Sequence, residues 1–173
     1  MNKNLALALT ATLFAAAAPA DAGEIFGGIY AHAVNTPFTL DSRFEGGADV
    51  QLGLRGESII PGTGLQPYVF GALNSDGGTN YAAAGLSWKF GDRIFVRPGL
   101  GVGIHSGSTA EFQQPDRIAF GSRILFEPEL GVGARINDRL TLEASWVHMS
   151  NGTIFSRQNP GMDNIGARLS LRL

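Results

Sequence analysis

Residues 124–136 read ILFEPELGVGARI, and their side chains alternate between two kinds. Every second residue from Ile124 is apolar, whereas most positions between them are glycine or charged. A period of two is typical of a β-strand whose two faces meet different surroundings. One face holds Ile124, Phe126, Pro128, Leu130, Val132, Ala134 and Ile136, and the other holds Glu127, Glu129, Gly131, Gly133 and Arg135. The segment 122–136 is therefore predicted to be a strand with one apolar face and one narrow polar face.

Seven further segments show the same period, and no stretch shows the period of an amphipathic helix. They cover residues 24–34, 46–56, 66–74, 80–90, 93–104, 139–149 and 163–173. The chain also holds 24 glycines, which suit close backbone approaches in an all-β fold. Eight strands close into a barrel whose interior is filled by side chains. We therefore predict an all-β, eight-stranded antiparallel transmembrane β-barrel without an open channel.

The polar face and the connections indicate which kind of membrane this barrel enters. The charged residues of the polar face would neutralise one another in the lumen; they are Glu129, Arg135, Glu143, Arg168 and Arg172. Tight turns at 91–92 and 137–138 contrast with long loops at 35–45, 105–121 and 150–162. Short turns at one end and long loops at the other are typical of bacterial outer-membrane barrels, with the long loops facing outward. The expected location is the bacterial outer membrane.

The N-terminus predicts export. Lys3 precedes an uncharged, mostly apolar run over 5–18, and Ala20-Asp21-Ala22 forms a small-x-small cleavage site. We therefore expect a signal peptide over 1–22 and a single barrel domain over 23–173. The chain has no cysteine, a net charge of −2 and no basic run, so disulfides, thiolate chemistry and nucleic-acid binding are not expected.

Polar side chains gather where segments 139–149 and 163–173 meet. The apolar face of the first segment continues into His148 and Ser150, two residues apart, whose side chains are close enough for a base and a nucleophile. Asp163 begins the second segment with outward parity and could orient the imidazole. Asn151 offers an amide donor for an oxyanion. These four residues are the predicted site at one rim of the barrel, and no metal or cofactor is required.

Other polar residues have structural interpretations. His105 begins a long loop and is expected to be solvated, whereas His32 is expected to be a partner at the rim or in the lumen. Gly99, Gly101 and Gly103 are expected to relieve crowding inside the barrel. The carboxylates Glu127, Glu129 and Glu143 are expected to form interior ion pairs with Arg135, Arg168 and Arg172. Trp88 and Trp146 are expected in the interfacial belt, and Trp146 alternatively flanks a substrate.

The tail resembles the lipid A 3-O-deacylases of the PagL type. The resemblance is carried by His148-Met149-Ser150-Asn151, followed by Asn159-Pro160-Gly161 and a closing strand. It implies an eight-stranded outer-membrane esterase in which His148 is the base, Ser150 the nucleophile and Asn151 part of the oxyanion hole. The family acid is typically a Glu downstream. No Glu follows Glu143 here, so Asp163 takes that place.

Three hypotheses follow. The first is a serine esterase that cleaves the 3-O-linked hydroxyacyl ester of lipid A in the outer leaflet, with lipopolysaccharide and membrane lipid as its partners. The second is a non-catalytic barrel that serves envelope integrity or adhesion. The third is a soluble periplasmic lipid-binding barrel whose apolar face points inward. Pairing with a second copy of the chain stays open.

Overall fold

The structure is a computed structural model that describes residues 22–39, 44–112, 114–157 and 159–173. The signal peptide predicted over 1–22 lies outside the described residues, apart from Ala22. The strands are β1 (Ala22–Ala31), β2 (Ala48–Gly56), β3 (Leu65–Asn74), β4 (Tyr81–Trp88), β5 (Phe90–Gly91), β6 (Ile94–His105), β7 (Ile124–Arg135), β8 (Leu140–Met149) and β9 (Met162–Arg172). Within those described ranges, no helix is long and apolar enough to cross a membrane.

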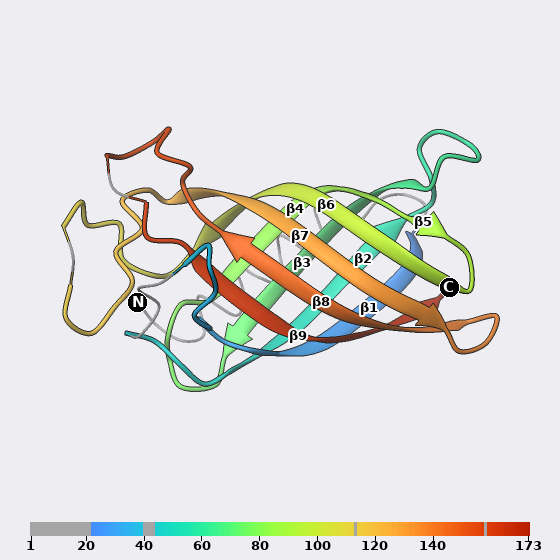
Figure 1. Cartoon of the computed structure of the whole chain (residues 1–173), viewed down its shortest axis with the longest axis horizontal. Helices are drawn as coiled ribbons and strands as arrows, with labels where there is room; N and C mark the ends of the chain where they lie inside the picture. The colour runs from blue at the N-terminus through green and yellow to red at the C-terminus, as the bar shows by residue number, and fades with distance from the viewer. Residues whose placement is uncertain (1–21, 40–43, 113, 158) are drawn as a thin grey trace.

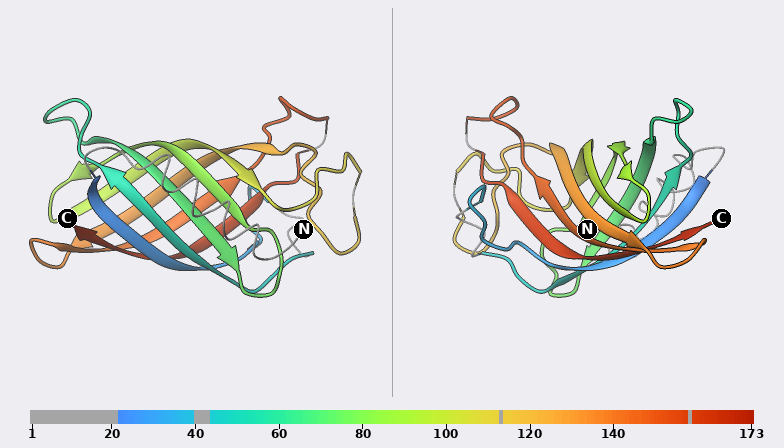
Figure 2. Two further views of the ribbon diagram at one scale, coloured as in Figure 1. Left: turned by 180° about the vertical axis from the view of Figure 1, so that it is seen from behind. Right: turned by 45° about the vertical axis from the view of Figure 1, so that its right-hand side comes forward.

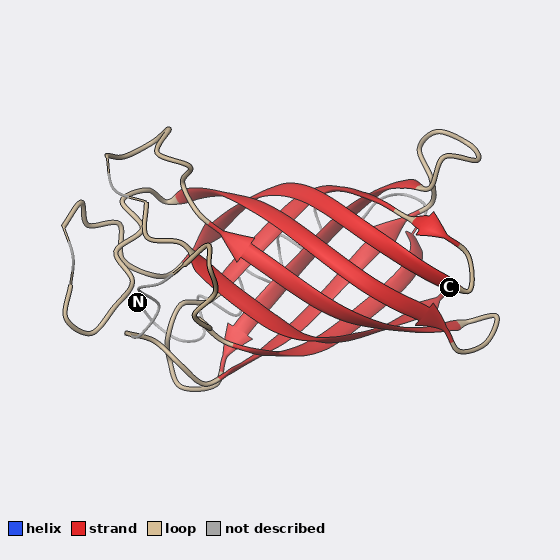
Figure 3. Ribbon diagram, viewed as in Figure 1, coloured by secondary structure: helices blue, strands red, loops and turns tan. Residues whose placement is uncertain are grey.

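The strands form one antiparallel sheet that closes on itself (Figures 1 and 3). The order is β4-β3-β2-β1-β9-β8-β7-β6, and pairing of β4 with β6 completes the ring. The short β5 continues β4 past Lys89 in the same register, because Ser87 pairs with Gly99 and Phe90 pairs with Val96. The barrel is therefore eight-stranded, as predicted. The first and last residues of each predicted segment lie within three residues of those of the observed strand.

The two ends of the barrel differ in their connections (Figures 1 and 2). The long-loop end carries the connections 32–47, 75–80, 106–123 and 150–161. The short-turn end carries 57–64, 92–93 and 136–139, together with the start of β1 and the C-terminus. The predicted asymmetry is present, and the connection 57–64 is the longest one at the short-turn end.

Side chains alternate across the wall as the sequence predicts. In β7, Leu125 and Glu127 are fully buried inside the barrel, whereas Ile124 and Val132 are about half exposed on the outer wall. The exposed residues of the other strands are likewise mostly apolar, which suits contact with lipid. The third hypothesis, a soluble barrel with its apolar face inside, is therefore wrong.

Arg168 lies at the centre of a buried ion network in the lumen. Its guanidinium nitrogens lie 2.8 Å from Glu129 and 3.4 Å from Glu143, and its Nε donates to the Tyr30 hydroxyl at 3.0 Å. Further cations and a carboxylate complete the network; they are Arg55, Arg97 and Glu24. Opposite charges are distributed so that each buried carboxylate named here has at least one cation within ion-pair distance.

Parts of the predicted network are wrong. Arg135 pairs with Asp92 at the short-turn end, and Arg172 lies on the exposed rim near Glu57, because both residues lie near the ends of their strands, beyond the lumen. Glu127 accepts a hydrogen bond from the Tyr68 hydroxyl instead of pairing with an arginine.

The predicted role of the lumen glycines is confirmed. An added Cβ would lie 2.6 Å from Cγ of Glu129 at Gly99, and 2.7 Å from Oε2 of Glu127 at Gly101. At Gly103 it would lie 2.8 Å from Cε of Met149. Each distance is shorter than a van der Waals contact, so glycine makes room for the large side chains that fill the barrel.

The two remaining histidines are both buried. His32 bonds to Asp49 and Glu45 at the rim, as expected. The expectation that His105 is solvated is wrong. It is the last residue of β6 and its parity points inward, so its ring packs on Phe120 and its Nε2 bonds to the carbonyl of Ser122.

Replacing Arg168 with Met should destabilise the barrel strongly, because Glu129 and Glu143 would lose a buried partner. We expect a loss of about 3–5 kcal/mol in the free energy of unfolding, measured by urea titration in lipid vesicles. Arg172→Met is the matched control on the same strand. It removes only an exposed pair and should change stability by about 0–1 kcal/mol. Equal effects of the two substitutions would contradict the central role of Arg168.

Candidate active site

The outer faces of β8 and β9 bring His148 and Asp163 together. These residues are direct register partners, and the next pair on the same face of the sheet, two residues along, is Trp146 with Ile165. Directly opposed residues have Cα atoms about 4.5–5.5 Å apart and project to the same face. On β9 the residues of this parity lie exposed on the outer wall, starting with Ile165. The pair therefore lies on the outside of the barrel, next to the long-loop end.

The carboxylate of Asp163 receives four hydrogen bonds. His148 Nδ1 and Trp146 Nε1 each lie 2.8 Å from Oδ1, and the hydroxyls of Thr36 and Thr39 donate to Oδ2. Although its side chain starts on the outer wall, Asp163 is completely buried. Charge-assisted hydrogen bonds to both oxygens fix the orientation of the carboxylate.

The segment 34–39 covers this carboxylate from the outside of the barrel. Its Val34 amide donates to the Asp163 backbone carbonyl at 2.8 Å, and Thr36 and Thr39 pair through their backbones at 3.2 Å. The Phe38 ring lies 5.7 Å from the ring of Trp146. A loop that follows β1 thus seals an acidic group that β9 would otherwise present to lipid.

The imidazole of His148 has one defined orientation. Its Nδ1 faces the carboxylate, so the fitting neutral tautomer carries its proton there and leaves Nε2 as the nitrogen that can accept a proton. The Trp146 ring lies 5.8 Å away at an interplanar angle of 27°. Gly161 lies against the other edge, where an added Cβ would be 2.6 Å from Cε1 and 3.2 Å from Nε2. The side chain is 13 % exposed, which leaves it within reach of a substrate.

Ser150 follows on the same strand face, as the parity predicts. Its backbone pairs with Phe126 of β7, through bonds of 2.7 and 3.1 Å, and the residue is 7 % exposed. No hydrogen bond joins Ser150 to His148 in the described part of the chain. The two are close neighbours along the strand, but the hydroxyl is not bonded to the imidazole in this arrangement.

Asn151 is fully buried and its carboxamide is engaged at both ends. The Nδ2 donates to the Phe120 carbonyl at 2.6 Å, and the Oδ1 accepts from the Thr153 amide at 2.7 Å. The Gly152 amide donates to Asn159 at 3.0 Å. The backbone amides of 152 and 153 therefore already have partners, and the turn after Ser150 is held by side-chain amides.

Apolar rings flank the site on both sides along the wall. Phe38 and Trp146 lie on one side, and Phe126 stacks with Phe155 at 5.7 Å on the other. A hydroxyl, an imidazole and a carboxylate between such rings form a set of groups that can cleave an ester of a lipid. Among the described residues, no cluster of three or more His, Asp or Glu side chains is placed to hold a metal ion.

The sequence did not indicate Thr36, Thr39 or the bond from Trp146 to Asp163. The two threonines lie 127 and 124 residues from Asp163 in the chain, so no local pattern connects them. The predicted belt position of Trp146 does not include this bond, although Trp146 and His148 share one strand face in the sequence pattern. Gly161 stood in the motif without a role, and its packing against the imidazole supplies one.

A family model described as "Lipid A 3-O-deacylase (PagL)" matches residues 44–172. This range includes His148, Ser150 and Asp163, but not the segment 34–39. No curated protein sequence matches the chain.

Several solved outer-membrane and designed barrels are similar to this one. The crystal structure of the outer membrane enzyme PagL has a TM-score of 0.63 and 18 % identity, covering 87 % of this chain and 99 % of that one. A de novo designed transmembrane β-barrel has a TM-score of 0.55 and 11 % identity, covering 90 % and 99 %. The crystal structure of Neisserial surface protein A has a TM-score of 0.52 and 10 % identity, covering 87 % of this chain and 96 % of that one. These likenesses concern the fold.

Gly161→Ala should lower ester hydrolysis, because the new methyl group would push the His148 ring away from its place beside Asp163. A displacement of about 1 Å can cost on the order of a hundredfold in rate. The measurement is kcat of the purified, refolded barrel. Gly27→Ala is the control, since its Cβ would meet only ordinary contacts of 3.5 Å or more. Unchanged kcat in Gly161→Ala would contradict the tight packing of the imidazole.

Proposed function

This chain belongs to the lipid A 3-O-deacylase (PagL) family, and on that premise we propose that it hydrolyses the 3-O-linked hydroxyacyl ester of lipid A by a serine mechanism. It is a β-barrel of the outer membrane, in agreement with its family, its closed sheet and its apolar outer wall. The proposed reaction takes place on the outer wall of the barrel, next to the long-loop end.

Ser150 is the proposed nucleophile. Its Oγ attacks the ester carbonyl while His148 Nε2 takes the hydroxyl proton, and an oxyanion donor on Asn151 stabilises the tetrahedral intermediate. The carbonyl carbon then loses the 3-oxygen of the sugar, which receives the proton from His148. Water repeats the sequence on the acyl-enzyme and releases a 3-hydroxy fatty acid with Ser150 restored. Asp163 orients the imidazole and stabilises the imidazolium throughout.

The buried Asp163 carboxylate on the outer wall is the observation that carries this proposal. An ionised group facing lipid is costly, and a barrel that serves only as a wall gains nothing from it. Four donors, two from β8 and two from the segment 34–39, compensate this cost, and one of them is an imidazole whose Nε2 makes no hydrogen bond within the described residues. That arrangement suits a general base better than a structural contact.

The bond between Ser150 and His148 is proposed to form with substrate bound. Catalytic hydrogen bonds are often long or misaligned without substrate and tighten in the complex. The two residues share one strand face, so rotation of the Ser150 side chain about its first torsion brings the hydroxyl toward the imidazole. An acyl chain between the flanking rings would exclude water from this space.

The direction of approach follows from the position of the site. Short turns of outer-membrane barrels face the periplasm, so the long-loop end is proposed to lie in the outer leaflet, where lipid A is found. A substrate already in that leaflet reaches His148 and Ser150 sideways from the membrane. The alternative of a non-catalytic envelope or adhesion barrel predicts that these two side chains are dispensable.

Ser150→Ala should abolish deacylation, because no other group supplies the nucleophile. The measurement is mass spectrometry of lipid A incubated in micelles with the purified barrel. The wild type should remove one hydroxyacyl mass, and so should Thr109→Ala, which deletes the hydroxyl of an exposed residue in a neighbouring loop. Full activity of folded Ser150→Ala would refute the mechanism, and unchanged lipid A with the wild type would favour the non-catalytic barrel.

The double variant Thr36→Val, Thr39→Val should also slow the reaction while Ser150 stays intact. It removes two of the four donors to Asp163, and hydrogen bonds to a charged group contribute about 1.5–3 kcal/mol each. A fall of at least roughly tenfold in kcat is expected on this basis. The control is Thr141→Val on β8, which lies away from Asp163 and should keep full activity. Equal activity in both variants would argue that the segment 34–39 is irrelevant to catalysis.

A further inference from the structure

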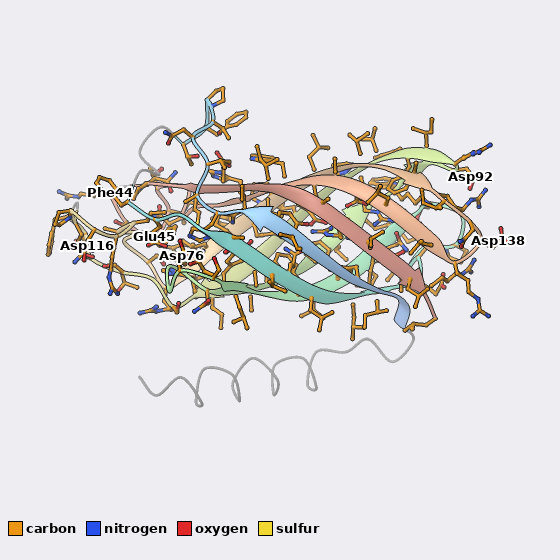
Figure 4. The ribbon with its side chains drawn as sticks, turned by 90° about the horizontal axis from the view of Figure 1, so that it is seen from below. Phe44, Glu45, Asp76, Asp92, Asp116 and Asp138 are labelled. Carbon is orange, nitrogen blue, oxygen red and sulfur yellow. The ribbon has the colours of Figure 1, made fainter. Side chains whose placement is uncertain are left out.

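Glu45 joins three loops at the long-loop end of the barrel, where Figure 4 places it with Asp76 and Asp116. Its carboxylate accepts from the Thr79 amide at 2.6 Å, the Thr79 hydroxyl at 3.1 Å and the Ile118 amide at 3.1 Å. The His32 Nε2 lies 3.2 Å away. We call Glu45, His32, Asp49, Thr79 and the Ile118 amide the Glu45 clamp.

The clamp is buried and charged. The side chain of His32 is fully buried and that of Glu45 is 5 % exposed. The other ring nitrogen of His32 lies 2.9 Å from Asp49, so both nitrogens face carboxylates and the ring carries a proton on each. The imidazolium of His32 thus lies between the carboxylates of Glu45 and Asp49, and it joins the loop 32–47 to the first residues of β2.

A short path leads from the clamp to the candidate nucleophile. Glu45 holds the amide of Ile118, and the segment 118–120 is buried against the top of the lumen. Two residues further, the Phe120 carbonyl accepts the Asn151 amide at 2.6 Å. Asn151 directly follows Ser150 and also holds the Thr153 amide. The segment 118–120 thus donates a hydrogen bond to Glu45 from its first residue and accepts one from Asn151 at its last residue.

We propose that Glu45 is a positioning residue for ester cleavage: by fixing the segment 118–120, which binds the Asn151 carboxamide, it sets the place of Asn151 and so of the oxyanion donor beside Ser150. This inference rests on the proposed function. It assigns a role in the reaction to a loop carboxylate that touches none of the proposed catalytic groups. Because the Asn151 side chain is hydrogen-bonded to the Phe120 carbonyl, a shift of the segment 118–120 would move Asn151, and the oxyanion donor with it.

Only a carboxylate satisfies this position. Four donor hydrogens point at its two oxygens, and each oxygen accepts two of them. The amide of a glutamine would present its own N–H groups to at least two of these donors. Glu45→Gln therefore opens the clamp although its size is unchanged.

The clamp has a defined pH range. Burial alone would lower the pKa of His32, but hydrogen bonds to Asp49 and Glu45 raise it to about 9. Burial opposes the ionisation of Glu45, yet bonds from His32 and Thr79 lower its pKa to about 2. Because the pKa of His32 is raised by folding, its protonation stabilises the folded loops fully at pH values below about 6.5. This contribution is lost as the pH rises through about 9.

On the acid side the sign is reversed. A lowered carboxylate pKa stabilises the loops above about 4.5, and the contribution is lost as the pH falls through about 2. Besides its own members, the titratable groups that face the clamp are Tyr81 from β4, next to Asp49, and His105 from β6, next to Glu45. The clamp is therefore intact through the neutral range and opens first at alkaline pH.

The test compares Glu45→Gln with Asp116→Asn, an exposed acid of the same loop end, in deacylation of lipid A micelles. Rates are counted per folded barrel, using the fraction that resists SDS without heating. We expect kcat of Glu45→Gln to fall by roughly ten- to hundredfold with KM unchanged, since misplacement of a donor affects the transition state. Asp116→Asn should match the wild type. An unchanged kcat in Glu45→Gln would overturn the proposal.

A double-mutant cycle separates positioning from a general loss of structure. If Glu45 acts through Asn151, then Glu45→Gln with Asn151→Ala should be no slower than Asn151→Ala alone. Multiplying losses would show that the two residues act independently and would overturn the proposal. If Glu45→Gln does not fold, Thr79→Val, which removes one of the four bonds, takes its place in the cycle.

A pH profile supplies a readout that a merely structural contact would not move. The wild type should lose kcat near pH 9, and His32→Gln, which does not titrate, should lack this alkaline decline. An identical decline in both proteins would contradict the clamp. Inactive Ser150→Ala together with fully active Glu45→Gln would refute the positioning role alone, whereas active Ser150→Ala would refute the proposed function itself.

Discussion

Closure of the sheet is the constraint on which the other features of this molecule depend. A ring of hydrogen-bonded strands leaves no free edge, so the backbone is satisfied inside a membrane and every side chain must point either into the lumen or toward lipid. Charges that point inward need partners within a narrow space, and Arg168 with Glu129 and Glu143 shows how they find them. A polar group that points outward cannot be compensated by the sheet, and its partners must come from the loops.

The outer wall at β8 and β9 illustrates that second case. Asp163 belongs by parity to the lipid-facing set, yet it is buried because the segment 34–39 folds over the wall and donates two hydroxyls. The loop 32–47 also supplies His32 and Glu45, which hold the neighbouring loops. One connection thus contributes to both sides of the candidate site: it seals the carboxylate on β9 and, in the proposed role of Glu45, steadies the residues that follow β8.

The fold was largely predictable from the sequence, because a period of two is a local signal and the closed barrel enforces it along every strand. The same parity placed His148, Ser150 and Asp163 on one face, and the motif after His148 led to the family that the comparison shows. Long-range partners were not predictable. Arg135 is a charged residue on a lumen-parity position, but whether it lies in the lumen depends on where the strand ends. The same reason applies to His105: it is the last residue of β6, whereas the sequence predicts that it begins the loop.

Register explains why an aspartate fits where the family resemblance leads one to expect a glutamate. Asp163 lies directly opposite His148, with Cα atoms about 4.5–5.5 Å apart, so a side chain with one methylene reaches Nδ1 at 2.8 Å. A longer side chain at this position would have to fold back, and it would lose the hydroxyls that grip the second oxygen. A shorter acid has fewer rotamers to restrict, and the bonds from Thr36 and Thr39 remove those that are left. A longer acid could contact His148 by extending its side chain. In the proposed mechanism, the strand register places the short Asp163 side chain within hydrogen-bond distance of His148, and the loop 32–47 fixes its orientation.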